Sequence, residues 1–286
     1  MKHIRLYAAS VAALCLLAPL AAGAQTAPAS PRVSDAALAR RPTPRLNGHP
    51  SLEGYWFSGT GSIPPFQYDT TRDAKGDIEV KTVRDPSEAP RPTSASPDNQ
   101  PDYKDELKQK TKDLFFHENK TDRVYNCGQP GLPRVGAPQR IVDNGKEMVF
   151  LYADLAGMVW RLIPIGGKLP TGNDPSYYGD SEAHWVGDTL VVHTTNFNED
   201  TWLGEYGYFH SDKMEVTEKF TRVGDTIRYD VTVSDPGVLK TPWVKPTVIM
   251  RLEKDNEIVE PSPCHLDPLL EGSPDGQDGQ FHIQRF

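Results

Sequence analysis

The strand predicted over residues 214–222 carries the side chain best placed to do chemistry. Met214, Val216, Glu218 and Phe220 share one face of it, and the other face is wholly polar. Because successive side chains of a strand alternate between its faces, the apolar face must point inward, and Glu218 with it. A buried carboxylate needs a partner or a changed protonation equilibrium. Glu218 is therefore a candidate general acid, general base or ligand anchor.

A second predicted strand, residues 158–165, carries Arg161 on the same face as Val159 and Ile163. The opposite face is also apolar, so the pattern alone does not fix which face is buried. If Arg161 points inward, two interpretations are open. It forms a structural ion pair with Glu218, or it binds a ligand, orienting a carboxylate or stabilising a developing oxyanion.

Three dispersed histidines are further candidates: His184, His193 and His210. They lack the H-x-H and H-E-x-x-H spacings of metal sites, so no metal is predicted. His184 and His210 are candidate general bases, and together with Glu218 they form the predicted catalytic set. His193 is predicted to contact the ligand. The alternative for each histidine is a hydrogen-bonded structural role.

The long loop predicted over residues 196–211 mixes aromatic side chains with polar ones. Trp202 and Tyr208 are predicted to stack on a small-molecule ligand at the rim of a pocket. Alternatively, the loop packs on the end of the domain through its own side chains. A third interpretation is an open platform for a polymer or glycan, with Trp202 and Tyr206 coplanar on the surface.

Several functional classes lack their signatures in this sequence. There is no G-x-G-x-x-G, no Walker lysine motif and no G-x-S-x-G elbow. Nucleotide-dependent and serine-hydrolase chemistry are therefore disfavoured, and no cofactor is predicted. The formal net charge is −8, which repels nucleic-acid phosphates and anionic lipid surfaces. A small molecule is the predicted partner, and the sequence leaves the oligomeric state open.

Residues 1–24 have the pattern of a cleavable secretory signal. Lys2 and Arg5 form its positive region, an apolar run follows over 6–20, and an A-x-A cleavage site lies at 22–24. The run is shorter than the roughly 20 apolar residues needed to span a bilayer. We therefore expect export to the periplasm or secretion, without membrane insertion. Loss of the two positive charges would take the net charge from −8 to −10.

Cysteine usage agrees with an oxidising compartment. Cys15 lies in the predicted signal, which leaves Cys127 and Cys264 as an even pair. A bridge between these two would close most of the domain into one loop and stabilise it by about 4–5 kcal/mol. The alternative is a catalytic thiol, although neither cysteine has the sequence context of a cysteine hydrolase.

The rest of the chain is predicted to form a single domain. Residues 25–50 are rich in proline and are predicted to be an unpacked arm, and residues 51–286 to be one β-barrel-like domain. This domain contains an insertion at about 85–118, a Pro-rich loop followed by a helix from Tyr103 to about Phe116 that begins at an Asp102 cap.

Serial hairpin signals dominate the region from residue 139 onward. The predicted hairpins pair 183–186 with 189–195, 214–222 with 227–234, and 244–252 with 257–260. Consecutive hairpins build antiparallel sheets, and closure into a barrel removes exposed edges. The predicted fold is mainly β, an antiparallel barrel or closed sheet with one short helix.

Residues 185–192 resemble the W-E-G-D-T-L-V-V motif of a large, mostly uncharacterised family of exported bacterial proteins. Further motifs are similar in the same family, namely C-x-x-P-G-x-P-R at 127–134, H-S at 210–211, E-R-F, which is E-K-F here, at 218–220, D-P at 235–236 and P-W at 242–243. The resemblance covers about residues 127–264 and supplies no catalytic residues. Residues 52–56 also resemble the G-x-W opening of lipocalin-like barrels, which implies a calycin-type barrel with a small apolar ligand inside.

Together these patterns favour a periplasmic or secreted β-barrel that binds a small, partly apolar or aromatic molecule. The catalytic hypothesis is a cofactor-independent lyase, isomerase or hydrolase that uses acid–base chemistry. The alternative is a non-catalytic carrier, or a surface or glycan-interaction protein. A direct ion pair between Glu218 and Arg161 in a filled interior would weaken the catalytic hypothesis.

Overall fold

The computed structural model divides the chain into two compact units, Met1–Val33 and Ser34–Phe286. The residues that it describes all belong to the second unit and are 34–58, 67–72, 78–83, 99–116, 121–154, 157–253 and 258. The predicted signal and Cys264 lie outside these residues, so cleavage and the disulfide bridge stay predictions. The second unit begins at Ser34, earlier than the predicted domain start at residue 51.

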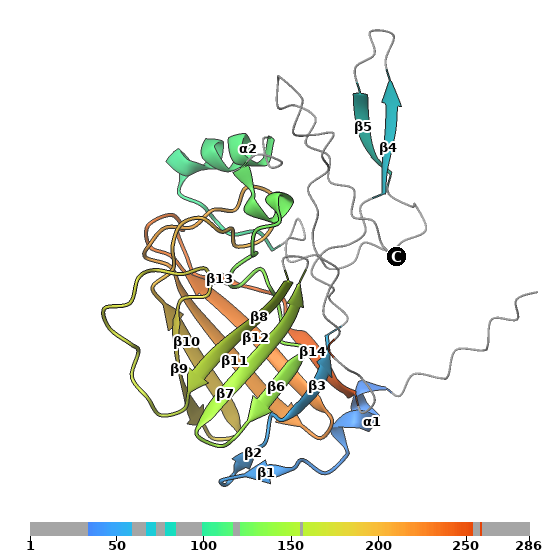
Figure 1. The fold of residues 1–286 in the computed structure, drawn as a ribbon, viewed down its shortest axis with the longest axis vertical. Helices are drawn as coiled ribbons and strands as arrows, with labels where there is room; N and C mark the ends of the chain where they lie inside the picture. The colour runs from blue at the N-terminus through green and yellow to red at the C-terminus, as the bar shows by residue number, and fades with distance from the viewer. Residues whose placement is uncertain are drawn as a thin grey trace, which may run out of the picture. The chain divides into compact units, whose positions relative to one another are not determined.

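The second unit is built on one ten-stranded antiparallel sheet (Figure 1). Its strands are β3 (Gly54–Phe57), β6 (Arg140–Asp143), β7 (Glu147–Asp154), β8 (Gly157–Pro164), β9 (Asp180–Val186), β10 (Thr189–Thr195), β11 (Glu215–Val223), β12 (Thr226–Ser234), β13 (Trp243–Val244) and β14 (Val248–Glu253). The order is β8-β7-β6-β3-β14-β12-β11-β10-β9, and β13 pairs with β12.

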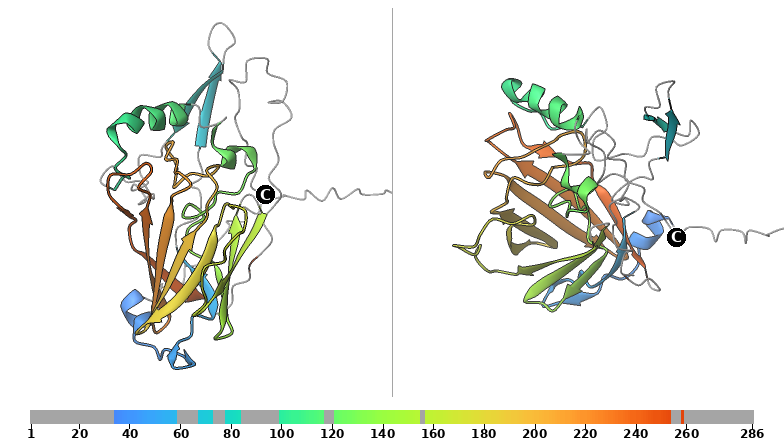
Figure 2. Two further views of the ribbon diagram at one scale, coloured as in Figure 1. Left: turned by 90° about the vertical axis from the view of Figure 1, so that its left-hand side faces the viewer. Right: turned by 45° about the horizontal axis from the view of Figure 1, so that its top comes forward.

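The sheet curves until its two end strands approach each other, which gives a nearly closed barrel (Figure 2). The ends β8 and β9 meet at an isolated bridge between Ile165 and Ala183. Beside it, the Gly166 N–H donates to the Ala183 carbonyl at 2.7 Å. The predicted mainly-β antiparallel fold is confirmed.

Two of the predicted hairpins are confirmed, and the third is only partly within the described residues. β9 pairs with β10, and β11 pairs with β12, around the predicted turns. β14 begins at Val248 rather than at residue 244, and it pairs with β12 and with the N-terminal strand β3. Most of its predicted partner, residues 257–260, lies outside the described residues. Pairing with β3 continues the sheet toward β6, a long-range choice that local hairpin signals do not encode.

Strand alternation places the interior as predicted. In β11 the side chains of Val216, Glu218 and Phe220 are buried, while those of Glu215 and Lys219 are exposed. The inward pointing of Glu218 is therefore confirmed.

In β8, Val159, Arg161 and Ile163 are buried, and Trp160 and Leu162 are exposed on the outer face. This resolves the face that the sequence pattern left open. Arg161 points into the barrel.

The helix in the predicted insertion is shorter than expected. A 3₁₀ turn, η1 (Asp105–Leu107), leads into α2 (Lys108–Phe116). Tyr103 is instead buried and forms a bridge with Leu239. Its hydroxyl donates to the Phe209 carbonyl at 2.5 Å, so tertiary contacts override the local helical signal. The Pro-rich loop before it lies mostly outside the described residues.

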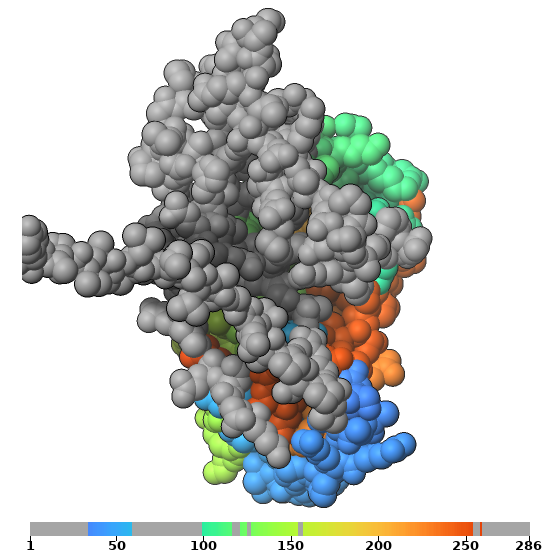
Figure 3. All heavy atoms as spheres, turned by 90° about the vertical axis from the view of Figure 1, so that its right-hand side faces the viewer, coloured from blue at the N-terminus to red at the C-terminus, as the bar shows by residue number. Residues whose placement is uncertain are grey.

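The predicted unpacked arm is wrong for its described part. Residues 34–50 form α1 (Asp35–Ala39), β1 (Arg45–Leu46) and β2 (His49–Pro50). Leu38 of α1 is buried, and its carbonyl accepts the N–H of Asp225. In Figure 3 the blue surface of this segment lies against the orange surface of the C-terminal strands. Prolines do not prevent packing here, because contacts to the barrel hold the segment in addition to its own β1–β2 pairing.

Two further strands, β4 (Gln67–Arg72) and β5 (Ile78–Val83), form a separate two-stranded antiparallel sheet that was not predicted. A short 3₁₀ turn, η2 (Arg123–Asn126), precedes Cys127. In the described part of the chain, no helix has both the length and the apolar character needed to cross a membrane.

Candidate functional site

The predicted Glu218–Arg161 ion pair is present inside the barrel. Glu218 is fully buried, Arg161 is 4% exposed, and Arg161 Nη1 lies 2.7 Å from Glu218 Oε2. The predicted ion pair between these two residues is therefore confirmed. The guanidinium neutralises the carboxylate that strand β11 carries into the core.

Two tyrosines complete the contacts of this ion pair. The Tyr229 hydroxyl donates to Glu218 Oε1 at 2.7 Å, and Arg161 Nη1 donates to the Tyr152 hydroxyl at 3.1 Å. Burial, followed by the charge of Glu218, raises the pKa of Tyr229 well above its ordinary value. Tyr229 therefore stays protonated and remains a hydrogen-bond donor to the carboxylate.

Arg161 also reaches the opposite end of the sheet. Its Nη2 donates to Ser181 Oγ on β9 at 3.1 Å and to Thr194 Oγ1 on β10 at 3.0 Å. Ser181 and Thr194 are hydrogen-bonded to each other at 3.0 Å. One guanidinium on β8 thus bonds to side chains from three strands beyond the gap in the barrel.

The electrostatics of Arg161 keep it charged. Burial alone opposes the charge, but the Glu218 carboxylate and the Tyr152 hydroxyl raise the pKa of Arg161 above its ordinary value. Its Nε has no hydrogen-bond partner among the described residues. The Arg161 Nε–H is therefore a buried donor that the ion pair and its neighbouring hydroxyl groups do not satisfy.

His210 is buried near the end of the aromatic loop, residues 196–211. Its Nδ1 lies 3.0 Å from the Ser211 carbonyl, and its Nε2 lies 2.9 Å from Thr201 Oγ1. A carbonyl oxygen only accepts, so Nδ1 carries a proton and Nε2 is free to accept from the Thr201 hydroxyl. Burial lowers the pKa of His210. Both ring nitrogens are engaged, which fits the structural alternative for this histidine.

His184 and His193 are not inside the barrel, which corrects the predicted site. In β9 the buried residues are Ser181 and Ala183, so His184 points outward and is exposed. In β10 His193 also points outward, and its Nε2 lies 3.3 Å from Glu215 Oε2. The alternation of side chains along β9 and β10 was the signal in the sequence that both histidines point outward.

Trp202 and Tyr208 are packed inside the loop and not presented to a ligand. Trp202 is 4% and Tyr208 8% exposed. Trp202 forms a bridge with Phe209, and the Tyr208 ring stacks on Tyr103 at 6.0 Å. The loop therefore packs on its own side chains, as the second interpretation held. The predictions of a pocket rim and of an open aromatic platform are wrong for Trp202 and Tyr208.

The glycine- and proline-rich segment after Cys127 runs into the core as an inner loop, defined here as residues 130–138. Leu132 is fully buried, and its N–H donates to the Tyr177 carbonyl at 3.1 Å. Arg134 pairs with the buried Asp122 at 2.6 Å. This loop contributes carbonyl oxygens to the interior of the domain.

Lys245 is an interior residue that the sequence analysis missed. It follows β13, whose Trp243 is buried, and its own backbone N–H donates to the Val231 carbonyl at 2.9 Å. Its Nζ donates to the Pro133 carbonyl of the inner loop at 3.1 Å. Burial lowers the pKa of Lys245 to about 8, against an opposing effect of Glu218. Because Trp243 and Lys245 are two residues apart on an extended segment, their side chains share a face, and this spacing was the sequence signal for an inward Lys245.

A pocket lies at the end of the barrel where the β9–β10 and β11–β12 turns are. It is beneath residues 41–50, which we call the strap. The strap crosses the hairpin turns of the barrel: Arg41 pairs with Asp225 at 2.6 Å, and Arg45 pairs with Asp188 at 2.8 Å. These contacts join the strap to the β11–β12 turn and to the β9–β10 turn.

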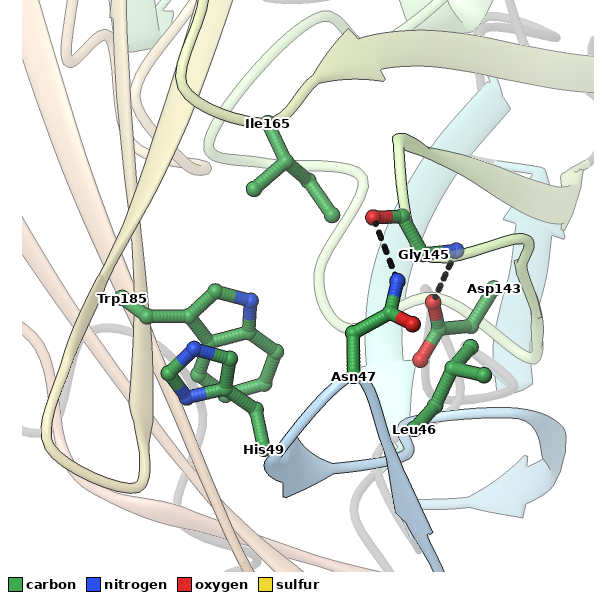
Figure 4. Close-up of a pocket in the computed structure, with 7 residues that line it drawn as sticks. All are labelled: Leu46, Asn47, His49, Asp143, Gly145, Ile165 and Trp185. Atoms are coloured by element: carbon green, nitrogen blue, oxygen red, sulfur yellow. Dashed lines mark hydrogen bonds between the residues drawn. The ribbon is translucent and has the colours of Figure 1, made fainter.

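Two further strap residues face the pocket (Figure 4). Asn47 Nδ2 donates to the Gly145 carbonyl at 3.2 Å, which ties the strap to the β6–β7 turn. The His49 ring stacks on Trp185 of β9, with centroids 4.7 Å apart and planes within 3°. Both residues were assigned to an unpacked arm by the sequence analysis, so the pocket was not foreseen.

The pocket has a volume of about 190 Å³ and combines apolar and polar groups. Its lining residues are Leu46, Asn47, His49, Asp143, Gly145, Ile165 and Trp185. In Figure 4 the stacked rings lie on one side of the opening, and Asn47 and Asp143 lie on the other, with Ile165 above. This arrangement can hold a small molecule that has an apolar face and a polar edge.

Within the described residues, no three His, Cys, Asp or Glu side chains are grouped so that they could hold a metal ion. Comparisons with family models, with curated proteins and with solved structures find no match for this chain. The family resemblance of residues 127–264 and the lipocalin-like opening therefore stay predictions.

Proposed function

We propose that this protein is an exported β-barrel that binds a small, partly apolar or aromatic molecule in the pocket beneath the strap. The observation that carries the proposal is the pocket itself, where a stacked His49–Trp185 pair faces the polar groups of Asn47 and Asp143. Apolar walls with a few placed polar groups are the usual composition of a ligand site.

The size of the pocket limits its occupant. Its volume of about 190 Å³ is below the roughly 300–1,000 Å³ that is common for drug-sized ligands. A compound with one ring fits this space better than an extended lipid. Asn47 Oδ1 favours a ligand edge that donates hydrogen bonds, because an amide oxygen is an acceptor. The two Asp143 oxygens already accept the N–H groups of Leu52 and Gly145, and the carboxylate adds negative charge to this edge.

The proposal is for binding without an assigned reaction. The predicted catalytic set is dispersed: Glu218 contacts Arg161 and Tyr229, His210 is engaged on both nitrogens, and His184 is exposed. Glu218 is fully buried, and its two oxygens already contact the Arg161 guanidinium and the Tyr229 hydroxyl. The non-catalytic carrier therefore fits the interior better than the acid–base enzyme does.

Ligand binding is tested by tryptophan fluorescence and thermal shift with a panel of single-ring probes: phenol, benzylamine and benzoate. We expect a donor-bearing probe, such as benzylamine, to raise the melting temperature in proportion to occupancy. Trp185→Phe should weaken this response. Trp160→Phe is the matched control, since Trp160 is 66% exposed on the outer face of β8. Equal responses of the two variants would remove the pocket from the proposal.

Export rests on the sequence pattern of residues 1–24. It is tested by expressing the full chain in a Gram-negative host and sequencing the N-terminus of the product. We expect mature protein in the periplasmic fraction, beginning at Gln25. Full-length protein retained in the cytoplasm would contradict export and leave the binding proposal untouched.

A further inference from the structure

We propose that Lys245 is a nucleophilic amine, held inside the barrel between Trp243 and the inner loop, that condenses with small aldehydes or ketones. The position is independent of the strap pocket. The strap packs on the turn that begins β12, whereas Lys245 is hydrogen-bonded to Val231 farther along the same strand.

The first support is where the amine lies. Trp243 pairs with Val233 and is buried, and Lys245 continues the same inward alternation. The Lys245 ammonium lies over the Trp243 ring at 5.6 Å from its centroid. Lys245 is thus a half-buried lysine, and the pKa of a lysine shifts readily on burial.

The second support is the set of charges around the amine. The Pro133 carbonyl accepts its hydrogen bond, and in the described part of the chain no salt bridge involves Lys245. Glu218, which favours the ammonium, is already paired with Arg161. Arg134 on the inner loop repels the ammonium. Burial and Arg134 together lower the pKa of Lys245 to about 8 despite Glu218, so a substantial neutral fraction exists near neutral pH.

A neutral lysine amine is the form that attacks carbonyl carbon. The Nζ lone pair forms a bond to the carbonyl carbon, and the carbonyl π electrons move to oxygen. The resulting carbinolamine loses water, which contains the former carbonyl oxygen and the two hydrogens of the amine. The products are an imine and one water molecule, and no oxidant or reductant is consumed.

The experiment traps the imine. The full chain is incubated with propanal and sodium cyanoborohydride, and modified lysines are mapped by peptide mass spectrometry over a time course from about pH 6 to about pH 10. We expect Lys245 to react about tenfold or more faster than the exposed Lys213 at pH 8, because far more of it is neutral. Its rate should level off above about pH 8.

Two variants make the result specific. Lys245→Met should abolish the fast adduct, while Lys213→Met should leave it unchanged, and circular dichroism checks that both fold. The wild-type comparison stands even if a variant does not fold. Modification of Lys245 at the rate of Lys213 or slower, or a rate that climbs steadily to pH 10, would overturn the proposal.

Discussion

Arg161 on β8 contacts Glu218 on β11 at 2.7 Å, across the gap where the barrel sheet ends. The same guanidinium donates to Ser181 on β9. The ends of the sheet share an isolated bridge rather than a full ladder. Side-chain bonds therefore supply at this gap part of the connection that backbone bonds supply between the other strands.

The first prediction concerns Glu218→Gln. It preserves size but leaves the charge of Arg161 buried without an anionic partner. Removing one member of a buried ion pair costs about 3–5 kcal/mol, and chemical denaturation should show a loss of this order in the free energy of unfolding. Glu215→Gln is the control on the same strand, where an exposed pair is worth about 1 kcal/mol or less. Equal effects of the two substitutions would contradict a special role for Glu218.

The second prediction is that the ion pair can be replaced as a unit. The double variant Arg161→Met/Glu218→Leu removes both charges and keeps apolar volume, so it should be much more stable than either single variant. Buried ion pairs often lose little when both partners become hydrophobic. A double-mutant cycle from denaturation curves gives the coupling energy, which should exceed about 1 kcal/mol. Additive losses would show that the two residues act separately.

The features that could be predicted from the sequence are those set by residues close together in the chain. Alternation within one strand placed Glu218 inside, and glycine-containing turns located the hairpins at Gly187 and Gly224. These are local rules with a period of two residues. The ion pair followed once both strands were known to face inward.

The strap pocket was not readable, because it depends on contacts between distant segments. His49 stacks on Trp185, and Asn47 bonds to Gly145, and neither pair has a local sequence signature. Proline content suggested an unpacked arm, since prolines remove backbone donors. The aromatic loop failed for a related reason. Its composition fits both a ligand rim and a self-packed loop, and only packing distinguishes them.

The third prediction concerns acid stability. Burial lowers the pKa of His210, against the smaller opposing effects of the Ser211 carbonyl, Asp235, Glu199 and Asp200. The unfolded chain, with an ordinary pKa near 6.5, therefore binds more protons than the folded chain in this range. The stability that His210 contributes is present above pH 6.5 and is lost as the pH falls below it toward the folded pKa.

Melting temperatures measured between about pH 7.5 and pH 5 test this dependence. His210→Gln keeps a polar side chain that does not titrate, so its melting temperature should fall less steeply as the pH is lowered. His184→Gln is the control, because His184 is exposed on the outer face of β9. If the wild type and His210→Gln lose stability in parallel, burial of neutral His210 is not the cause.

The fourth prediction concerns Lys245 and is independent of its reactivity. The folded pKa of about 8 lies below the ordinary value of 10.5, so between these values the unfolded chain binds more protons and stability rises with pH. Below pH 8 the folded protein carries a poorly solvated ammonium.

Lys245→Met removes this charge while keeping an unbranched side chain beside Trp243. Denaturation at pH 7 should therefore show a more stable protein, and the gain should shrink as the pH is raised from about 8 toward 10. Lys213→Met, at an exposed position, should change neither the stability nor its pH dependence. A Lys245→Met protein that is less stable than wild type at pH 7 would mean that the hydrogen bond to Pro133 outweighs the cost of desolvating the ammonium.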